Sequence, residues 1–350
     1  MLAVHSFPFC FSELRKNYNE GITEKKGDMR RIEESARIAL NDCMALKKHE
    51  SLLVLTDDRT LMIGETLFNV GKTITKESYL LVMTAGEVNG QEPPGPIADL
   101  MSKHDVVICP TLRSLTHTKA RRDACKAGAR VGTMPGITEE VMIRTLKADY
   151  YKIAKRTFHL SKILDEANEV CIKTKRGTDI VLPLKGIKAI SSTGLIREKG
   201  SYGNLPSGES FLMPVEGQSD GNFIVDGSFA GVGLIKEMPV KIEVKSGYAT
   251  KIEGGKEAKK LRNMLRPFGK QAYTIAELGI GTNDQAIITG SILEDEKVMG
   301  TVHIALGNNL SMGGTCDVGI HLDGVILEPT VFIDNKMIME NGKFRIKSLK

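Results

Sequence analysis

Two histidines in the C-terminal half of the chain lie in sequences that suit metal binding. His321 is followed two positions later by Asp323, and in a β-strand such residues share one face, two rises of roughly 3.3 Å apart. His303 interrupts an apolar, strand-like run at residues 300–307. Because imidazole nitrogens and carboxylate oxygens both bind divalent ions, these three residues predict a metal site.

Two glutamates in unusual surroundings extend this set. Glu277 lies inside the apolar segment 275–281, and Glu209 follows the glycine of segment 205–211. A carboxylate in an apolar strand is costly unless a cation or hydrogen bonds compensate it. Each residue alone also fits an ordinary structural role, such as a strand histidine with satisfied hydrogen bonds or a carboxylate on an edge strand. Their occurrence together favours one shared metal site.

The N-terminal half contains a second group of polar residues, at positions 110–121. The group directly follows an apolar run at 105–109, and ligands of open α/β sheets bind at the carboxyl ends of strands. Arg113 and His117 are therefore candidates for binding and orienting an anionic group of a substrate. In a simpler interpretation, Thr116 or Thr118 only caps the helix that follows.

The elements that would position these residues differ between the two halves. In the first half, short apolar runs alternate with helical patterns, which predicts a parallel sheet covered by helices. The runs span residues 51–55, 79–83, 105–109 and 129–133. No GxGxxG sequence follows the first run, so a bound dinucleotide is not expected. After residue 171, strand-like alternation is broken by glycine turns and by a helical pattern near 255–265, which predicts an antiparallel or mixed sheet.

We therefore expect an α/β fold with two domains, as the length of 350 residues also suggests. An N-terminal Rossmann-like domain with a parallel sheet precedes a C-terminal α+β domain, whose mixed or antiparallel sheet carries the metal site. The predicted segments are an irregular N-terminal arm (1–28), the Rossmann-like domain (29–150, beginning with a helix at about 30–47), a bridging helix (151–170) and the metal-binding domain (171–350).

Composition narrows the class of protein. The chain has 48 basic and 43 acidic residues, a net charge of +5, no tryptophan and only 5% aromatic residues, so nucleic-acid binding is not expected. Its six cysteines contain no CxxC pair and indicate reduced thiols. No segment has the pattern of a signal peptide or a membrane span. These features predict a cytoplasmic protein without a membrane partner.

At these residues the sequence resembles the thermophilic aminopeptidase family, that of aminopeptidase T, over most of the chain beyond about residue 30. The resemblance is carried by residues 114–118, 133–136, 207–209, 276–279, 303–307 and 321–323. It implies a homodimer with divalent metal ions (Zn, Co or Mn), two per chain. It also implies that the metal ligands are Glu209, Glu277, His303, His321 and Asp323.

Two positions depart from the family pattern. Leu310 stands where the family has a tyrosine, and no residue aligns cleanly with the family's catalytic glutamate. Glu296 is the nearest candidate, with Glu294 behind it. The chain is also shorter than typical peptidases of the family. In length it is similar to a related branch, the 2,5-dihydroxypyridine dioxygenases, which hold one iron with two histidines and an aspartate.

Three functions are compatible with these residues. The first, which we expect, is a metallo-aminopeptidase that removes N-terminal residues from small peptides, with Glu296 as general base for a metal-activated water. Glu209 and Glu277 favour it, because two metals need more carboxylates than one. The second is a ring-cleaving dioxygenase for a small dihydroxypyridine-like aromatic, with Fe(II) bound by two histidines and Asp323. The third is a non-catalytic ligand-binding protein, in which the polar residues would be scattered in space.

Overall fold

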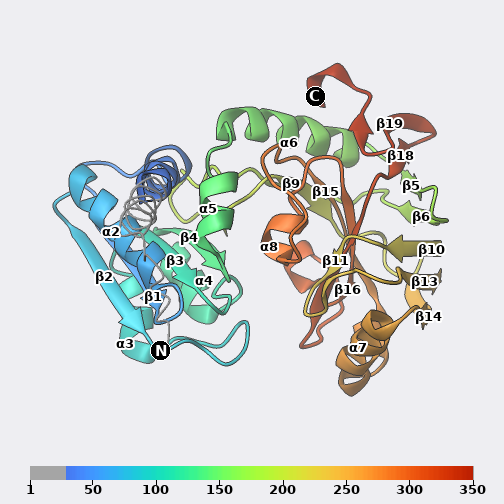
Figure 1. The fold of residues 1–350 in the computed structure, drawn as a ribbon, viewed down its shortest axis with the longest axis horizontal. Coiled ribbons are helices and arrows are strands. Elements are labelled where there is room, and N and C mark those ends of the chain that lie inside the picture. The colour runs from blue at the N-terminus through green and yellow to red at the C-terminus, as the bar shows by residue number, and fades with distance from the viewer. Residues whose placement is uncertain (1–28, 350) are drawn as a thin grey trace, which may run out of the picture.

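The computed structural model describes residues 29–349, and the predicted arm at 1–28 lies outside the described residues. The described chain forms two lobes joined by a long helix (Figure 1). The first helix runs over residues 29–37 and continues as the π-helical turn η1 (Ile38–Cys43). It ends before the predicted residue 47, because Ala45 has a φ of 48° and cannot continue a helix.

The N-terminal lobe contains a five-stranded parallel sheet with the order β2-β1-β3-β4-β8. All four predicted apolar runs are confirmed as strands. Alternate residues of its central strands belong to two separate apolar cores, one packed under η1 and α2 and the other under α3 and α4. The elements are β1 (Leu52–Asp57), α2 (Leu61–Ile74), β2 (Ser78–Met83), α3 (Gly95–Met101), β3 (Val106–Thr111), α4 (Lys119–Lys126), β4 (Arg130–Pro135) and α5 (Glu139–Thr145).

The edge strand of this sheet comes from a distant part of the sequence. β8 (Tyr202–Asn204) pairs in parallel with β4, although residues 202–204 fall within the segment 171–350 that we predicted to form the C-terminal domain. A three-residue strand is too short to show periodicity in the sequence. The chain therefore leaves the N-terminal lobe and returns to it before entering the C-terminal lobe for good.

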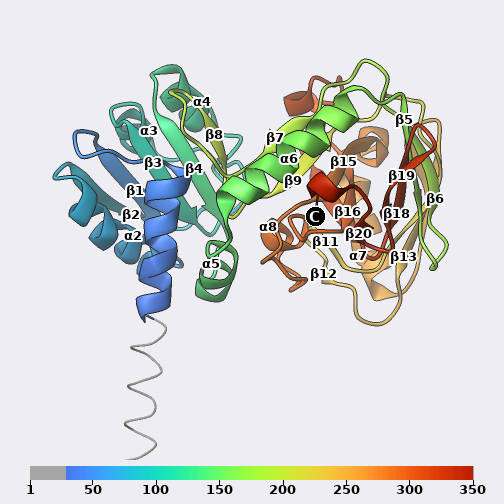
Figure 2. The same ribbon diagram turned by 90° about the horizontal axis from the view of Figure 1, so that it is seen from above.

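Helix α6 (Tyr150–Asp165) connects the two lobes, as Figure 2 shows. The Asp149 side chain caps its first turn by accepting hydrogen bonds from two backbone N–H groups. Its N-terminal residues Tyr150 and Ile153 belong to the core of the first lobe, whereas Leu160 and Leu164 belong to the core of the second. The helix therefore fixes one lobe against the other through two buried faces.

The C-terminal lobe contains two antiparallel sheets that share one apolar core. The eight-stranded sheet has the order β14-β13-β10-β6-β5-β18-β19-β20, and the seven-stranded sheet has the order β12-β11-β17-β16-β15-β9-β7. The strands of the first are β5 (Glu169–Lys173), β6 (Asp179–Pro183), β10 (Asp220–Val225), β13 (Val240–Lys245), β14 (Tyr248–Glu253), β18 (Thr330–Ile333), β19 (Lys336–Glu340) and β20 (Lys343–Phe344). Those of the second are β7 (Ile190–Ser192), β9 (Glu209–Leu212), β11 (Ser228–Phe229), β12 (Gly233–Leu234), β15 (Ile275–Gly281), β16 (Val302–Gly307) and β17 (His321–Ile326).

The predicted fold class is confirmed: a parallel α/β lobe precedes an α+β lobe with antiparallel sheets. The lobe also contains α7 (Lys256–Leu265), which lies where the helical pattern was expected, and the short helix α8 (Ile292–Asp295). Arg144 of α5 forms a bidentate ion pair with Glu294 of α8, with Nη2 2.7 Å from Oε2, and so ties the two lobes together. Among residues 29–349, no helix is long and apolar enough to cross a membrane.

Candidate metal centre

The seven-stranded sheet of the C-terminal lobe presents two unlike faces. Residues such as Leu278, Ile304 and Leu322 point into the shared core. The residues that alternate with them, including Glu277, His303 and Asp323, point the other way. Ala305 pairs in register with both Glu277 and Asp323. Because alanine is small, the two carboxylates can converge above it.

A glycine makes room for the buried histidine. Gly279 of β15 lies opposite His303 of β16 in the strand register. A Cβ atom at Gly279 would lie only 2.0 Å from His303 Nε2, so any larger residue would displace the imidazole ring. The close approach of β15 to the His303 ring therefore requires a glycine at position 279.

One group of ligand-type atoms gathers around Glu277, His321 and Asp323. Each residue offers one atom to a set in which all atoms lie within 4.8 Å of one another. His321 Nε2 is 3.2 Å from Asp323 Oδ1 and 3.4 Å from Glu277 Oε2. The His321 side chain is 31% exposed, so this group opens towards solvent.

The ring of His321 is oriented by the backbone behind it. Its Nδ1 donates a hydrogen bond to the carbonyl oxygen of Asn308, at 2.7 Å. This bond directs Nε2 towards the two carboxylates and leaves that nitrogen as the metal-binding atom. An imidazole held in this way by a carbonyl oxygen is the usual support of a metal-binding histidine.

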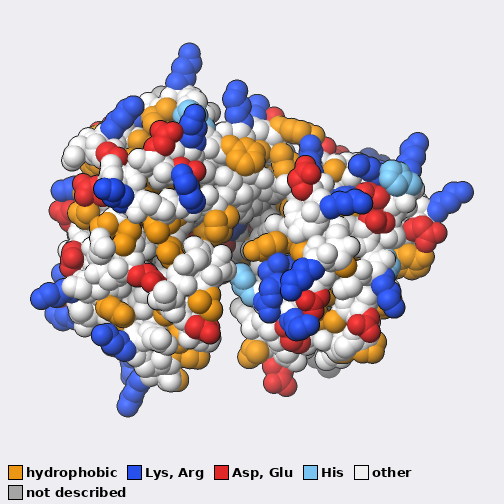
Figure 3. All heavy atoms as spheres, turned by 180° about the vertical axis from the view of Figure 1, so that it is seen from behind, with side chains coloured by type: hydrophobic (Ala, Val, Ile, Leu, Met, Phe, Trp, Pro, Cys, Tyr) orange, Lys and Arg blue, Asp and Glu red, His pale blue; other side chains and the backbone are white. Residues whose placement is uncertain are grey.

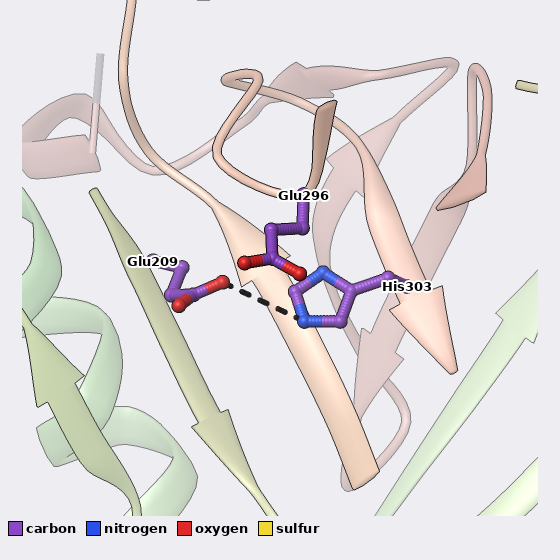
Figure 4. Close-up of side chains that lie close together, drawn as sticks. All are labelled: Glu209, Glu296 and His303. Carbon is purple, nitrogen blue, oxygen red and sulfur yellow. Dashed lines mark ion pairs between the residues drawn. The ribbon is translucent and has the colours of Figure 1, made fainter. Parts of the chain in front are cut away.

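A second group, more deeply buried, consists of Glu209, Glu296 and His303 (Figure 4). Glu209 comes from β9, His303 from β16, and Glu296 follows α8 directly. His303 Nε2 lies 3.6 Å from Glu209 Oε2 and 3.2 Å from Glu277 Oε1, so Glu277 links the two groups. Within the described residues, Glu209 Oε2 and His303 Nδ1 are buried without a hydrogen-bond partner.

A lysine lies inside this second group. Lys297 Nζ is 2.7 Å from Glu209 Oε1 and also contacts Glu296 Oε1. Its side chain is only 1% exposed. Lys297 was not among the predicted site residues, because a lysine after the acidic run 294–296 has the pattern of a solvated surface segment.

Charge and burial shift the protonation of both groups. Burial alone would lower the pKa of His303, but its hydrogen bond with Glu277 and the charge of Glu209 raise that pKa to about 9. The pKa of His321 is likewise raised well above its usual value, despite burial, by the carboxylate of Asp323. Burial raises the pKa of Glu296 to about 8, whereas Glu277 stays well below its usual pKa because both histidines donate hydrogen bonds to it.

Residues of the N-terminal lobe face this site across a groove. Seen from behind, the molecule is hollowed between its two lobes (Figure 3). The pKa of His117 is lowered by partial burial and by the nearby charge of His321, so this residue lies close to the metal-binding group. Arg113 is exposed and lies against Gly86, away from it. The structure thus brings all six C-terminal candidates together, whereas His117 is linked to them by the charge of His321 and Arg113 is not among them.

Of the two threonines expected to cap the helix after this segment, Thr118 does so. Thr118 is the N-cap of α4, where its hydroxyl accepts a hydrogen bond from the N–H of Arg121 at 3.2 Å. Asp57, at the end of β1, accepts a 2.6 Å hydrogen bond from the N–H of Leu112 and so fixes the start of the loop. The loop that carries His117 is therefore anchored at both ends.

The fold is that of aminopeptidase T, as two solved structures show. The structure is similar to wild-type AmpT from Thermus thermophilus, with a TM-score of 0.66 and 16% identity over 91% of this chain and 99% of that one. It is also similar to 2,5-dihydroxypyridine dioxygenase from Pseudomonas putida KT2440, with a TM-score of 0.80 and 19% identity over 92% of this chain and 98% of that one.

Sequence comparison defines the family within this fold. Residues 47–346 match the family of 2,5-dihydroxypyridine 5,6-dioxygenases. A curated member, the 2,5-dihydroxypyridine 5,6-dioxygenase of Pseudomonas putida KT2440, is 26% identical over 246 residues, which cover 65% of this chain and 68% of that protein. The chain therefore belongs to the 2,5-dihydroxypyridine 5,6-dioxygenase family, a family of enzymes.

This membership overturns the expected aminopeptidase function. The family and the curated relative are dioxygenases, so the prediction of a hydrolase, with Glu296 as the base of a hydrolytic reaction, is wrong. The prediction relied on Glu209 and Glu277 as ligands of two metals. Of these two, Glu209 is paired with Lys297, as is Glu296, whereas Glu277 contacts His303 and His321.

Proposed function

We propose that this chain is a ring-cleaving dioxygenase for a dihydroxylated pyridine, with Fe(II) held by Glu277, His321 and Asp323. The convergence of these three residues on one point carries the proposal. Membership of the 2,5-dihydroxypyridine 5,6-dioxygenase family supports the substrate class.

The donor set fits iron. It offers one imidazole nitrogen and two carboxylates, which are nitrogen and oxygen ligands of the same types as in the 2-His-1-carboxylate set of non-haem Fe(II) oxygenases, with Glu277 in the place of one histidine. His303, which we expected as the second histidine of an iron triad, converges with Glu209 and Glu296 instead. Iron bound at this place supplies the centre at which molecular oxygen and an aromatic diol react.

The surrounding side chains have distinct roles in this proposal. His303 Nε2 donates to Glu277 Oε1 at 3.2 Å and holds that carboxylate in position. Glu209 is buried and ion-paired with Lys297, so it acts behind the metal-binding group and not on the substrate. His117 contacts the substrate from the other side of the groove, and Arg113 lies further out, where an anionic substituent would meet it.

Oxygen uptake tests this function. The chain is stripped of metal, loaded with Fe(II) without oxygen, and mixed with 2,5-dihydroxypyridine in an oxygen electrode. We expect oxygen consumption together with loss of the aromatic absorbance. The Zn-loaded chain and iron-loaded Asp323→Asn, which keeps the shape of the side chain but not its charge, should both be inactive. Folded, iron-loaded protein that consumes no oxygen with any isomeric dihydroxypyridine would refute the proposal.

A further inference from the structure

Lys297 has an environment that is unusual for a lysine. It is one of the largest fully buried side chains of the described residues, and its ammonium group contacts carboxylates of Glu209 and Glu296. A buried lysine is costly unless anionic partners compensate its charge. The two carboxylates that compensate it are two of the three members of the second metal-type group.

Backbone hydrogen bonds hold the turn that carries Lys297. Lys297 N–H donates to the carbonyl oxygen of Glu294 at 2.9 Å, and its own carbonyl oxygen accepts from Asn283 N–H at 2.9 Å. The same turn packs against Gly281 of β15, where a Cβ atom would lie 2.1 Å from the carbonyl oxygen of Val298. The turn therefore cannot withdraw from the sheet without breaking these contacts.

An ammonium group and a metal ion compete for the same place here. Its protons occupy Oε1 of Glu209 and Oε1 of Glu296, and two cations a few ångströms apart repel strongly in a buried environment. Among the described residues, the carboxylates of the first group, Glu277 and Asp323, have histidines and no lysine as their ion-pair partners. A metal ion can therefore supply positive charge to the first group, whereas the ammonium group already supplies it to the second.

We propose that Lys297 is a built-in cation that takes the place of a second metal ion, so that the chain binds one metal ion and not two. The single ion lies at Glu277, His321 and Asp323, while Glu209 and Glu296 are reserved for the lysine. This inference rests on the proposed function for the site of that ion. It adds the residue that sets the number of metal ions.

The test is the metal stoichiometry of wild type and Lys297→Met, with Mn²⁺ as the probe. Each metal-stripped protein is titrated calorimetrically, and the dialysed product is analysed for manganese. We expect one ion per chain in the wild type and two in Lys297→Met, because a methionine of similar length frees both carboxylates. Lys297→Arg, which keeps the positive charge, should still bind one. The double variant Lys297→Met with Glu209→Gln should return to one.

Paramagnetic resonance gives an answer even if Lys297→Met does not fold. Wild-type protein in excess Mn²⁺ should show the spectrum of isolated ions, whereas two ions about 4 Å apart would be exchange-coupled. A coupled spectrum, two ions in the wild type, or one ion in folded Lys297→Met would each overturn the inference while leaving the proposed function intact. A wild type that binds no ion would overturn both.

Discussion

The two groups of acidic residues and histidines offer similar ligands in unlike surroundings. The open group, Glu277, His321 and Asp323, includes a histidine side chain that is 31% exposed. The closed group, Glu209, Glu296 and His303, has a histidine side chain that is 1% exposed and contains the ammonium group of Lys297. One group can reach a soluble ion and a substrate, whereas the other already has its cation.

The difference shows why ligand types alone do not determine the number of metal ions. A carboxylate attracts an ammonium group as well as a metal, and the choice depends on which cation the fold delivers to it. In the closed group the short helix α8 delivers Lys297 from a neighbouring turn. Glu277 lies between the two groups and contacts both histidines, so the groups are adjacent but not equivalent.

Substituting the histidine of each group in turn gives the largest expected contrast. His321→Ala removes a proposed metal ligand. Metal affinity should therefore fall by more than the roughly 10- to 100-fold that follows the loss of a residue that only hydrogen-bonds to a ligand. His303→Ala removes only a hydrogen bond to Glu277, and its effect should stay within that range. Calorimetric titration with Mn²⁺, alongside oxygen uptake, measures both.

These two histidine variants can also contradict the separation of the two groups. If His303→Ala loses the metal as completely as His321→Ala does, the ion is shared by both histidines and the two groups act as one site. Thermal melts of the metal-stripped variants should accompany the titrations, so that unfolding is not mistaken for loss of a ligand.

The pH dependence of metal binding sharpens the comparison further. The pKa of His321 is raised well above its usual value and that of His303 to about 9, so both are protonated in the metal-free chain at neutral pH. A metal ion must displace the proton of each histidine that it binds. Metal affinity should therefore rise with pH, by about tenfold per pH unit for each displaced proton, and level off above the pKa.

The number of displaced protons identifies the ligands. Titrations at pH 7 in buffers of different ionisation enthalpy should give a release of about one proton per ion, from His321 alone. Release of about two would mean that His303 also loses its proton and binds the metal. Affinity that does not change between pH 6 and pH 9 would contradict the protonated state of His321.

Much of this molecule could be predicted from the sequence because the relevant signals are local. The buried strands β1 and β3 are unbroken apolar runs, and Thr118 precedes its helix in the sequence as it caps it in space. The spacing of His321 and Asp323 predicted that they share one face of a strand, and the apolar surroundings of Glu277 and His303 added these two residues to the same site, where the structure brings them together. Periodicity sufficed for these elements.

The parts that could not be predicted depend on contacts between distant segments. β8 joins a sheet whose nearest strand lies some 70 residues earlier, as the pairing of Val131 with Tyr202 shows. Lys297 meets Glu209 across 88 positions, and no local pattern distinguishes it from a surface lysine. The choice between hydrolase and dioxygenase could not be made from the ligand residues alone. Family membership decided it, and of the two glutamates that suggested two metals, Glu209 is paired with that lysine.

Substitution of Gly279, which packs against His303 of the closed group, gives the smallest expected effect. In Gly279→Ala the new Cβ atom would lie 2.0 Å from His303 Nε2, so the ring must shift and its hydrogen bond with Glu277 must lengthen. Crowding of this kind should lower the free energy of unfolding by about 1–3 kcal/mol. Urea denaturation measures this change. Gly95→Ala is the matched control, because no described residue beyond its chain neighbours and its own helix lies within 4 Å of a Cβ atom at that position.

The metal content of the same variant then tests whether the groups are separate. If the open group binds the ion by itself, Gly279→Ala should keep one metal ion per chain despite its lower stability, because His321 and Asp323 lie on β17 and are held independently of β15. Wild-type stability would show that the ring has more freedom than the 2.0 Å approach implies. Loss of the ion would show that Glu277 transmits the displacement of His303 to the open group, and that the two groups form a single mechanical unit.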